Sequence, residues 1–160
     1  MGHNNTMKLI FLLTMFFSLA AFAQLGTKKS MTLEAAKQLA AAAQVEAVAN
    51  KWTMVIVIVD DGGNLVYLEK MDETQIGSVD VAIAKAQSAV KFKRPTKAFE
   101  DTLAGGRQAI LKLPGAIPIE GGVPLMIDGR VIGAVGVSGA LSSQDGQAAA
   151  AAVKAFEKMK

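Results

Sequence analysis

The sequence predicts an α+β domain in which two antiparallel hairpins form one sheet and helices pack against it. Residues 53–59 are a continuous run of β-branched and apolar residues, residues 60–64 have the composition of a turn, and residues 65–71 follow as the return strand. Residues 124–127 and 130–137 flank an Asp-Gly pair, which suits the type I′ turn of a two-residue hairpin. Two hairpins that alternate with helices favour a single antiparallel sheet over a parallel βαβ arrangement.

The first two helices are predicted from capping residues and apolar spacing. Thr32 is a suitable N-cap for an alanine-rich helix over residues 33–50, with an acidic residue in its first turn. A second helix is expected to begin at Ser78 and to run to about Phe92. Its expected buried stripe, at spacings of four, three and four, comprises Val79, Ile83, Ala86 and Val90.

Two more helices are expected in the second half of the chain. Pro95 ends the second helix, and Thr96 can cap a third helix with Phe99, Leu103 and Ile110 on its buried side. Residues 113–123 contain two prolines and three glycines, which predicts a shaped loop with a short strand at 117–119. The last helix is expected to start at Ser142, with Asp145 completing an approximate capping box and a stripe at Ala149, Val153, Phe156 and Met159.

The N-terminus has the pattern of a secretion signal. A basic start at Met7-Lys8 precedes an apolar run over residues 9–20 and an A-x-A site at 21–23, so we expect cleavage after Ala23. An uncleaved anchor is the alternative, although the run is shorter than the roughly 20 residues of a membrane span. Residues 1–6 fit a myristoylation pattern but precede the signal, and we interpret them as a mis-assigned start or added residues. The expected product is a single domain over residues 24–160, periplasmic or secreted, without stable membrane insertion.

Composition narrows the classes of function. Of 17 basic residues only Lys8 precedes residue 24, so the mature chain has 16 basic and 14 acidic residues, a balance that does not indicate nucleic-acid binding. Cysteine is absent, and the only histidine is His3. Disulfides, attachment of lipid to cysteine and the usual nucleophile–base pairs are therefore excluded from the mature chain.

Other polar residues give weak signals for chemistry. Ser138 lies in Gly-Val-Ser-Gly, which is only superficially like a nucleophile elbow, and we expect it to end a strand beside a tight turn. The carboxylate pairs at 60–61 and 72–73 could hold a metal, but aspartates in turns commonly bond their own backbone. The basic run at 91–97 could face the carboxylates of a ligand or stabilise the end of the second helix.

Lys85 is the sharpest single observation. At helical spacing it points away from the Ile83 stripe and shares a face with Ser78, Ala82 and Ala89. This pattern indicates close approach by a ligand or another helix, and the alternative is a lysine on a solvated alanine face. We expect Lys85→Glu to weaken ligand binding and to leave the fold intact.

A series of segments, in order along nearly the whole mature chain, resembles the GlcG/HbpS-like family, often labelled haem-degrading. The segments are Thr32–Ala36, Val57–Gly63, Met71-Asp72, Ala84–Ala86, Pro95-Thr96, Gly121–Leu125, Gly133–Gly139 and Gln144-Asp145. The resemblance implies a profilin-like α-β-α sandwich, frequent homo-oligomers and, in some members, haem binding. It also implies that the ligand region is lined by Met71, Lys85, Thr96, Gly121 and Gly122.

Three hypotheses for function follow. The first is an exported protein that binds haem or a similar tetrapyrrole for storage, scavenging or sensing. The second is an enzyme that degrades haem or another small molecule, in which bound iron does the chemistry. The third is an oligomeric structural or interaction module. Iron would need an unusual donor such as Thr96, Tyr67, Met71 or Lys85, so the metal ligand remains unknown.

Overall fold

The computed structural model describes residues 25–160, and these residues form the predicted α+β fold. The predicted order of helices and hairpins is confirmed, with one 3₁₀ helix added in the loop after the third helix of the prediction. The expected signal sequence and its cleavage site lie outside the described residues. The elements are α2 (Leu33–Ala49), β1 (Val55–Asp60), β2 (Leu65–Lys70), α3 (Ser78–Phe92), α4 (Lys97–Ala104), η1 (Gln108–Lys112), β3 (Gly122–Ile127), β4 (Arg130–Ser138) and α5 (Ser142–Glu157).

The two hairpins pair through their long strands into one antiparallel sheet of order β2-β1-β4-β3. β1 is central, and its residues Val55 to Val59 are all fully buried, as the unbroken apolar run predicted. Because side chains alternate across a strand, Ile56 and Ile58 belong to one core while Val55, Val57 and Val59 belong to the other.

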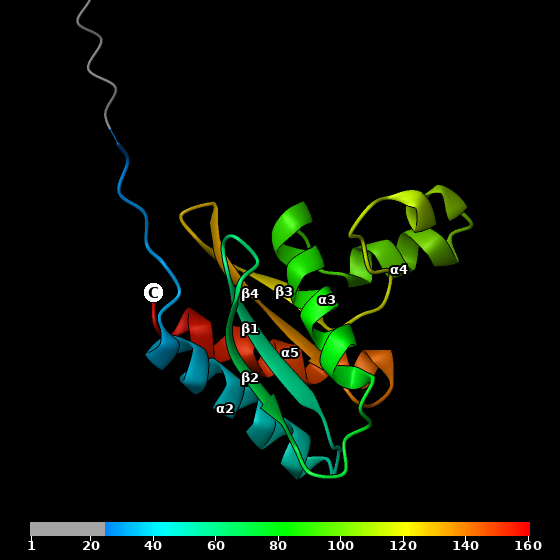
Figure 1. Cartoon of the computed structure of the whole chain (residues 1–160), viewed down its shortest axis with the longest axis horizontal. Helices are drawn as coiled ribbons and strands as arrows, with labels where there is room; N and C mark the ends of the chain where they lie inside the picture. Colours follow the sequence, from blue (N-terminus) through cyan, green and yellow to red (C-terminus); the bar gives the residue numbers. More distant parts are fainter. Residues whose placement is uncertain (1–24) are drawn as a thin grey trace, which may run out of the picture.

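The helices cover both faces of the sheet, which makes the α-β-α sandwich. α2 and α5 lie together on one face, where they enclose the larger core, and α3 lies on the other (Figure 1). α4 and η1 extend away from the sheet, on the same side of it as α3 (Figure 1). No helix in the described residues is both long enough and apolar enough to cross a membrane.

Both hairpin turns have the hydrogen bonds or backbone angles that their residue types favour. The Asp60 carboxylate accepts hydrogen bonds from the backbone N–H groups of Gly62 and Asn64, at 2.8 and 2.9 Å, which confirms the turn interpretation of this aspartate. Asp128 and Gly129 both have positive φ, 49° and 74°, as the predicted type I′ turn requires.

The buried face of α3 agrees with the predicted one only in part, because Ala86 and Val90 are buried as predicted but the rest of the face is different. Ser78, Ala82, Lys85 and Ala89 face the sheet and are buried, whereas Val79 and Ile83 are only half-buried. The reason is the approach of α3 to β4: a Cβ on Gly136 would lie 2.7 Å from the Ala86 nitrogen, so only small residues fit between the two backbones. The element that approaches the alanine face is a strand, not the ligand or helix that the sequence suggested.

Three local predictions also need correction. The third predicted helix ends at Ala104, and Ile110 lies in η1 because Gly105-Gly106 breaks the helix. Residues 117–119 form no strand. The N-cap of α5 is Leu141, not Ser142, and only half of a capping box forms: the Leu141 N–H donates to the Gln144 side chain, while leucine has no side-chain acceptor to complete the box.

Candidate functional site

The structure brings together four of the five residues expected to line a ligand region. Lys85, Thr96, Gly121 and Gly122 meet where α3, the start of α4 and the start of β3 come together. Met71 does not join them, because it follows β2 and packs against the core that α2 and α5 enclose. A role in ligand binding stays a prediction for all five residues.

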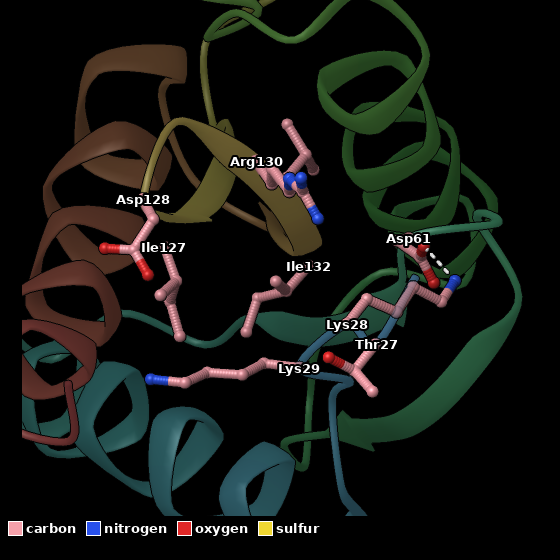
Figure 2. A pocket seen from close by; sticks show the side chains of 9 residues that line it. Thr27, Lys28, Lys29, Asp61, Ile127, Asp128, Arg130 and Ile132 are labelled. Carbon is pink, nitrogen blue, oxygen red and sulfur yellow. Dashed lines mark hydrogen bonds and ion pairs between the residues drawn. The ribbon is translucent and has the colours of Figure 1, made fainter. Parts of the chain in front are cut away.

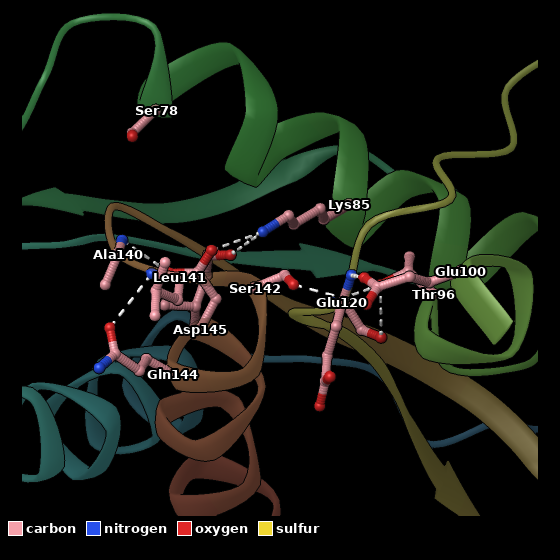
Figure 3. A network of polar contacts seen from close by, with 12 residues as sticks. Ser78, Lys85, Thr96, Glu100, Glu120, Ala140, Leu141, Ser142, Gln144 and Asp145 are labelled. Atoms are coloured by element: carbon pink, nitrogen blue, oxygen red, sulfur yellow. Dashed lines mark hydrogen bonds and ion pairs between the residues drawn. The ribbon is translucent and has the colours of Figure 1, made fainter. Parts of the chain in front are cut away.

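Lys85 is an internal ion-pair partner, not a residue on a solvated face. Its side chain is 1% exposed, and its Nζ donates to the Asp145 carboxylate at 2.7 Å and to the Val137 carbonyl oxygen at 3.0 Å. The Asp145 carboxylate also accepts from the Ala140 N–H at 3.1 Å (Figure 3). Burial raises the pKa of the Asp145 carboxyl above its usual value, although the Lys85 ammonium acts in the opposite direction. The pair therefore ties α3 to the first turn of α5 through a low-dielectric contact.

Thr96 fixes the start of β3 to the turn before α4. Its hydroxyl accepts a hydrogen bond from the Gly122 N–H at 2.9 Å, and its own N–H donates to the Gly122 carbonyl oxygen at 2.9 Å. Thr96 is fully buried and is the N-cap residue of α4, but its side chain makes no capping hydrogen bond. The Thr96 hydroxyl is therefore hydrogen-bonded to β3 and does not cap the helix.

The two glycines of this cluster are needed for close packing. A Cβ on Gly121 would lie 2.6 Å from the Val137 carbonyl oxygen and 2.9 Å from the Lys85 ammonium, and one on Gly122 would lie 2.7 Å from the Thr96 methyl group. Gly121 also has φ of 126°, a conformation that other residues rarely adopt. The four residues leave no space between them for a macrocycle.

A second set of polar groups borders this cluster. Glu100 accepts hydrogen bonds from the Glu120 N–H and, at 3.5 Å, from the Ser142 hydroxyl (Figure 3). Burial raises the pKa of Glu120, whose side chain packs against Gly146 in α5. These contacts connect α4 and the loop before β3 to the start of α5.

The weaker candidates from the sequence are accounted for by local structure. Ser138 is the last residue of β4 and is 5% exposed, as expected for a strand end. The carboxylate pairs lie in the turns that include Asp61 and Glu73. Within residues 25–160, no three groups of the kinds that bind metal ions come together.

A cavity lies between the segment before α2 and the β3–β4 hairpin. Its volume is about 650 Å³. Ile127 and Ile132 project from the hairpin toward the segment that carries Lys28 and Lys29 (Figure 2). The remaining lining residues are Thr27, Asp61, Asp128, Arg130 and Val131. An ion pair between Lys28 and Asp61 holds the segment to the β1–β2 turn (Figure 2).

A second cavity of about 400 Å³ adjoins the first and shares Lys28, Lys29, Ile127 and Ile132 with it. Its other walls come from the start of α2 and the end of α5, and they are mostly apolar. They are Ser30, Met31, Ala35, Phe156 and Met159. We call the two cavities together the N-terminal groove. The groove combines an apolar floor with cations at its edge, which suits an amphipathic anion.

The basic run at the end of α3 lies beside a smaller cleft. Arg94 stacks 5.7 Å from the centre of the Phe99 ring, and Phe99 meets Phe92 edge-to-face with ring centres 5.2 Å apart. The cleft has a volume of about 250 Å³ and also contacts Arg107. Lys91 lies in the last turn of α3, where a cation stabilises the helix dipole, in agreement with the structural interpretation of this run.

Sequence reasoning missed the groove because its walls are distant in the chain. Lys29 and Met31 precede α2, Ile132 lies in β4, and Phe156 lies near the C-terminus. No local spacing connects these positions. The one available signal was the basic pair Lys28-Lys29, which follows the expected cleavage site after four intervening residues.

Comparison with known proteins agrees with this fold. A family profile described as "Haem degrading protein HbpS-like" matches residues 31–154. Protein GlcG of Escherichia coli strain K12 is 39% identical over 112 residues, which cover 70% of this chain and 84% of GlcG. Among solved structures, Klebsiella pneumoniae ORFY superposes with a TM-score of 0.80 at 33% identity, covering 89% of this chain and 100% of that one. A PduOC:haem complex gives a TM-score of 0.72 at 27% identity, covering 79% and 95%. This chain belongs to the GlcG/HbpS-like family.

Proposed function

We propose that the mature protein binds haem or a closely similar tetrapyrrole in the N-terminal groove. The observation that carries the proposal is the groove itself, which joins apolar walls to two cations, Lys29 and Arg130, that form no ion pair within residues 25–160. Its two cavities, of about 650 and 400 Å³, fall in the range of roughly 300–1,000 Å³ that is common for small-molecule sites. The haem-bound structure of PduOC, a protein with the same fold, supports tetrapyrrole as the class of ligand.

The residues of the groove fit the periphery of haem. The flat macrocycle needs apolar contacts, which Ile127, Ile132 and Phe156 offer. The propionates need cations, and neither Lys29 nor Arg130 forms an ion pair with another described residue. Asp128 lowers the net positive charge of the edge but leaves it positive.

Haem in this groove would supply a redox-active iron, and the protein would bind and orient it. Lys29 and Arg130 would hold the carboxylate edge, while the apolar walls would exclude water from one face of the ring. Storage or scavenging requires only these binding contacts.

Titration of residues 24–160 with hemin tests the proposal. We expect a saturable, shifted Soret band, and we expect Lys29→Glu/Arg130→Glu to weaken binding roughly tenfold or more through loss of charge-assisted hydrogen bonds. The matched control is Arg94→Glu/Arg107→Glu, which makes the same change of charge at the smaller cleft and should leave affinity unchanged. A flat difference spectrum, or an effect confined to the control, would refute the proposed site.

The same loaded protein separates binding from degradation. With ascorbate or peroxide added, a binding protein should keep its Soret band at least as long as free hemin does. Faster loss with a defined product would support the enzyme hypothesis instead.

We also propose that the protein is exported and self-associates. The A-x-A site at residues 21–23 supports export, and sequencing of the N-terminus of the secreted or periplasmic protein tests it, with Gln24 as the expected first residue. Val45 and Val48 on the outer face of α2 are 70% and 59% exposed, which favours a closed homo-oligomer. Light scattering of the mature chain should give a mass above that of the monomer.

A further inference from the structure

The iron of haem would meet few donors in this protein. Residues 24–160 contain neither histidine nor cysteine, the commonest protein ligands of haem iron. Thioether sulfur is the next customary donor, and the mature chain offers it at Met31, Met54, Met71, Met126 and Met159.

The four donors suggested by the sequence are all engaged elsewhere. Thr96 is fully buried, and Lys85 is 1% exposed and ion-paired. The Tyr67 hydroxyl donates to a neighbouring glutamate, and Met71 packs against the core. None of these four residues lines the N-terminal groove.

Two methionines border the groove, and their side chains differ in exposure and in packing. Met31 is 9% exposed, and its terminal methyl would lie 3.3 Å from a Cβ on Gly133, so it is committed to packing against β4. Met159 is 39% exposed and lies just after α5, three residues beyond the buried ring of Phe156. An unbranched side chain at this position can turn its sulfur into the cavity at little cost.

We propose that Met159 supplies the axial sulfur to haem iron bound in the N-terminal groove. The inference rests on the proposed function, and it assigns the metal ligand that neither the sequence nor the family resemblance identified. The Phe156 ring then lies beside the bound macrocycle as an apolar wall, and Met31 serves as core packing.

The experiment compares hemin with metal-free protoporphyrin IX on residues 24–160. The unaltered protein should show the near-infrared charge-transfer band of thioether-ligated ferric haem. Met159→Leu, which keeps the apolar volume, should abolish that band and weaken hemin binding roughly tenfold. Binding of protoporphyrin should stay within about twofold, because the free base has no iron to ligate.

Met126→Leu is the matched control, because Met126 is half-buried on β3 and does not line the groove. It should keep the band, and so should Met31→Leu. If hemin binds without the band, or if Met159→Leu retains it, the donor assignment is wrong while the proposed function stands. If neither hemin nor protoporphyrin binds, the proposed function fails and the donor assignment fails with it.

Discussion

Removal of the Lys85 ammonium is the perturbation whose effect follows most directly from the structure. Lys85→Met keeps most of the buried stem and removes the charge that faces Asp145. The Asp145 side chain is only 3% exposed and would retain its hydrogen bond from the Ala140 N–H as a buried, uncompensated carboxylate. Breaking one partner of a buried ion pair costs about 3–5 kcal/mol, a large share of the stability of a domain this size.

The loss of folding free energy caused by Lys85→Met should depend on pH in a defined direction. Burial already holds the pKa of Asp145 above its usual value, and loss of Lys85 removes an influence that lowers it. A carboxyl with a raised folded-state pKa favours folding when protonated, and that contribution is lost as pH rises through the folded-state pKa. The difference between Lys85→Met and the unaltered protein should therefore shrink as pH falls.

Urea unfolding of residues 24–160, at neutral pH and at stepwise lower pH, measures both effects. We expect Lys85→Met to lose about 3–5 kcal/mol at neutral pH, and Lys85→Met/Asp145→Leu to lose less than the sum of the two single variants, because no charge then remains buried. A loss below about 1 kcal/mol for Lys85→Met, the size of an exposed pair, would refute the buried-pair account. This reasoning also corrects the expectation that Lys85→Glu leaves the fold intact, since it would place two carboxylates together.

Gly136→Ala should lower the free energy of unfolding by about 1–3 kcal/mol or more, because the added methyl group overpacks against α3. Gly77→Ala is the control: a Cβ there meets no atom within 4 Å, so its free energy of unfolding in the same urea assay should stay within about 0.5 kcal/mol of that of the unaltered protein. Thr96→Val should cost about 1–3 kcal/mol because the buried Gly122 N–H loses its acceptor, and Thr96→Ser should recover most of that loss; equal stability of both variants would be inconsistent with the hydrogen bond. Glu120→Gln should raise the urea midpoint at neutral pH, since a carboxyl with a raised pKa destabilises the fold when it is ionised. The gain in midpoint should vanish as acid protonates Glu120 in the unaltered protein, and a difference that does not depend on pH would contradict this.

The strands were predictable because their signals are local. The unbroken run before Asp60 needs cover on both faces, and Asp128-Gly129 has few options other than a tight hairpin turn. The family resemblance added the α-β-α sandwich, which the helices on both faces of the sheet confirm.

Apolar periodicity predicted the buried face of α3 only in part, since Ala86 and Val90 are buried but Val79 and Ile83 are only half-buried. That rule assumes that the larger apolar residues face the core, but here the helix packs on Gly136, where a backbone approaches too closely for anything larger than alanine. The glycines of β4 carried this information, yet only the pairing of α3 with β4 shows which helix uses them.

The sequence likewise did not show which groups bind the buried Lys85 ammonium. Asp145 is 60 positions from Lys85, and the Val137 carbonyl belongs to a third element. The sequence identified Lys85 as unusual, because it lies among small residues, but the tertiary fold decides whether such a residue faces a ligand or an ion-pair partner. The groove, with walls from both ends of the chain, depends on the tertiary fold in the same way.

Amide NMR spectra of residues 24–160 titrated with metal-free protoporphyrin IX test the central claim most directly, because they locate the ligand without relying on its iron. Binding in the N-terminal groove predicts saturable shifts centred on Lys29, Ile127 and Ile132. Shifts centred instead on Gly121 and Gly122, with Ile127 and Ile132 unmoved, would contradict it and place the ligand at the cluster around Lys85.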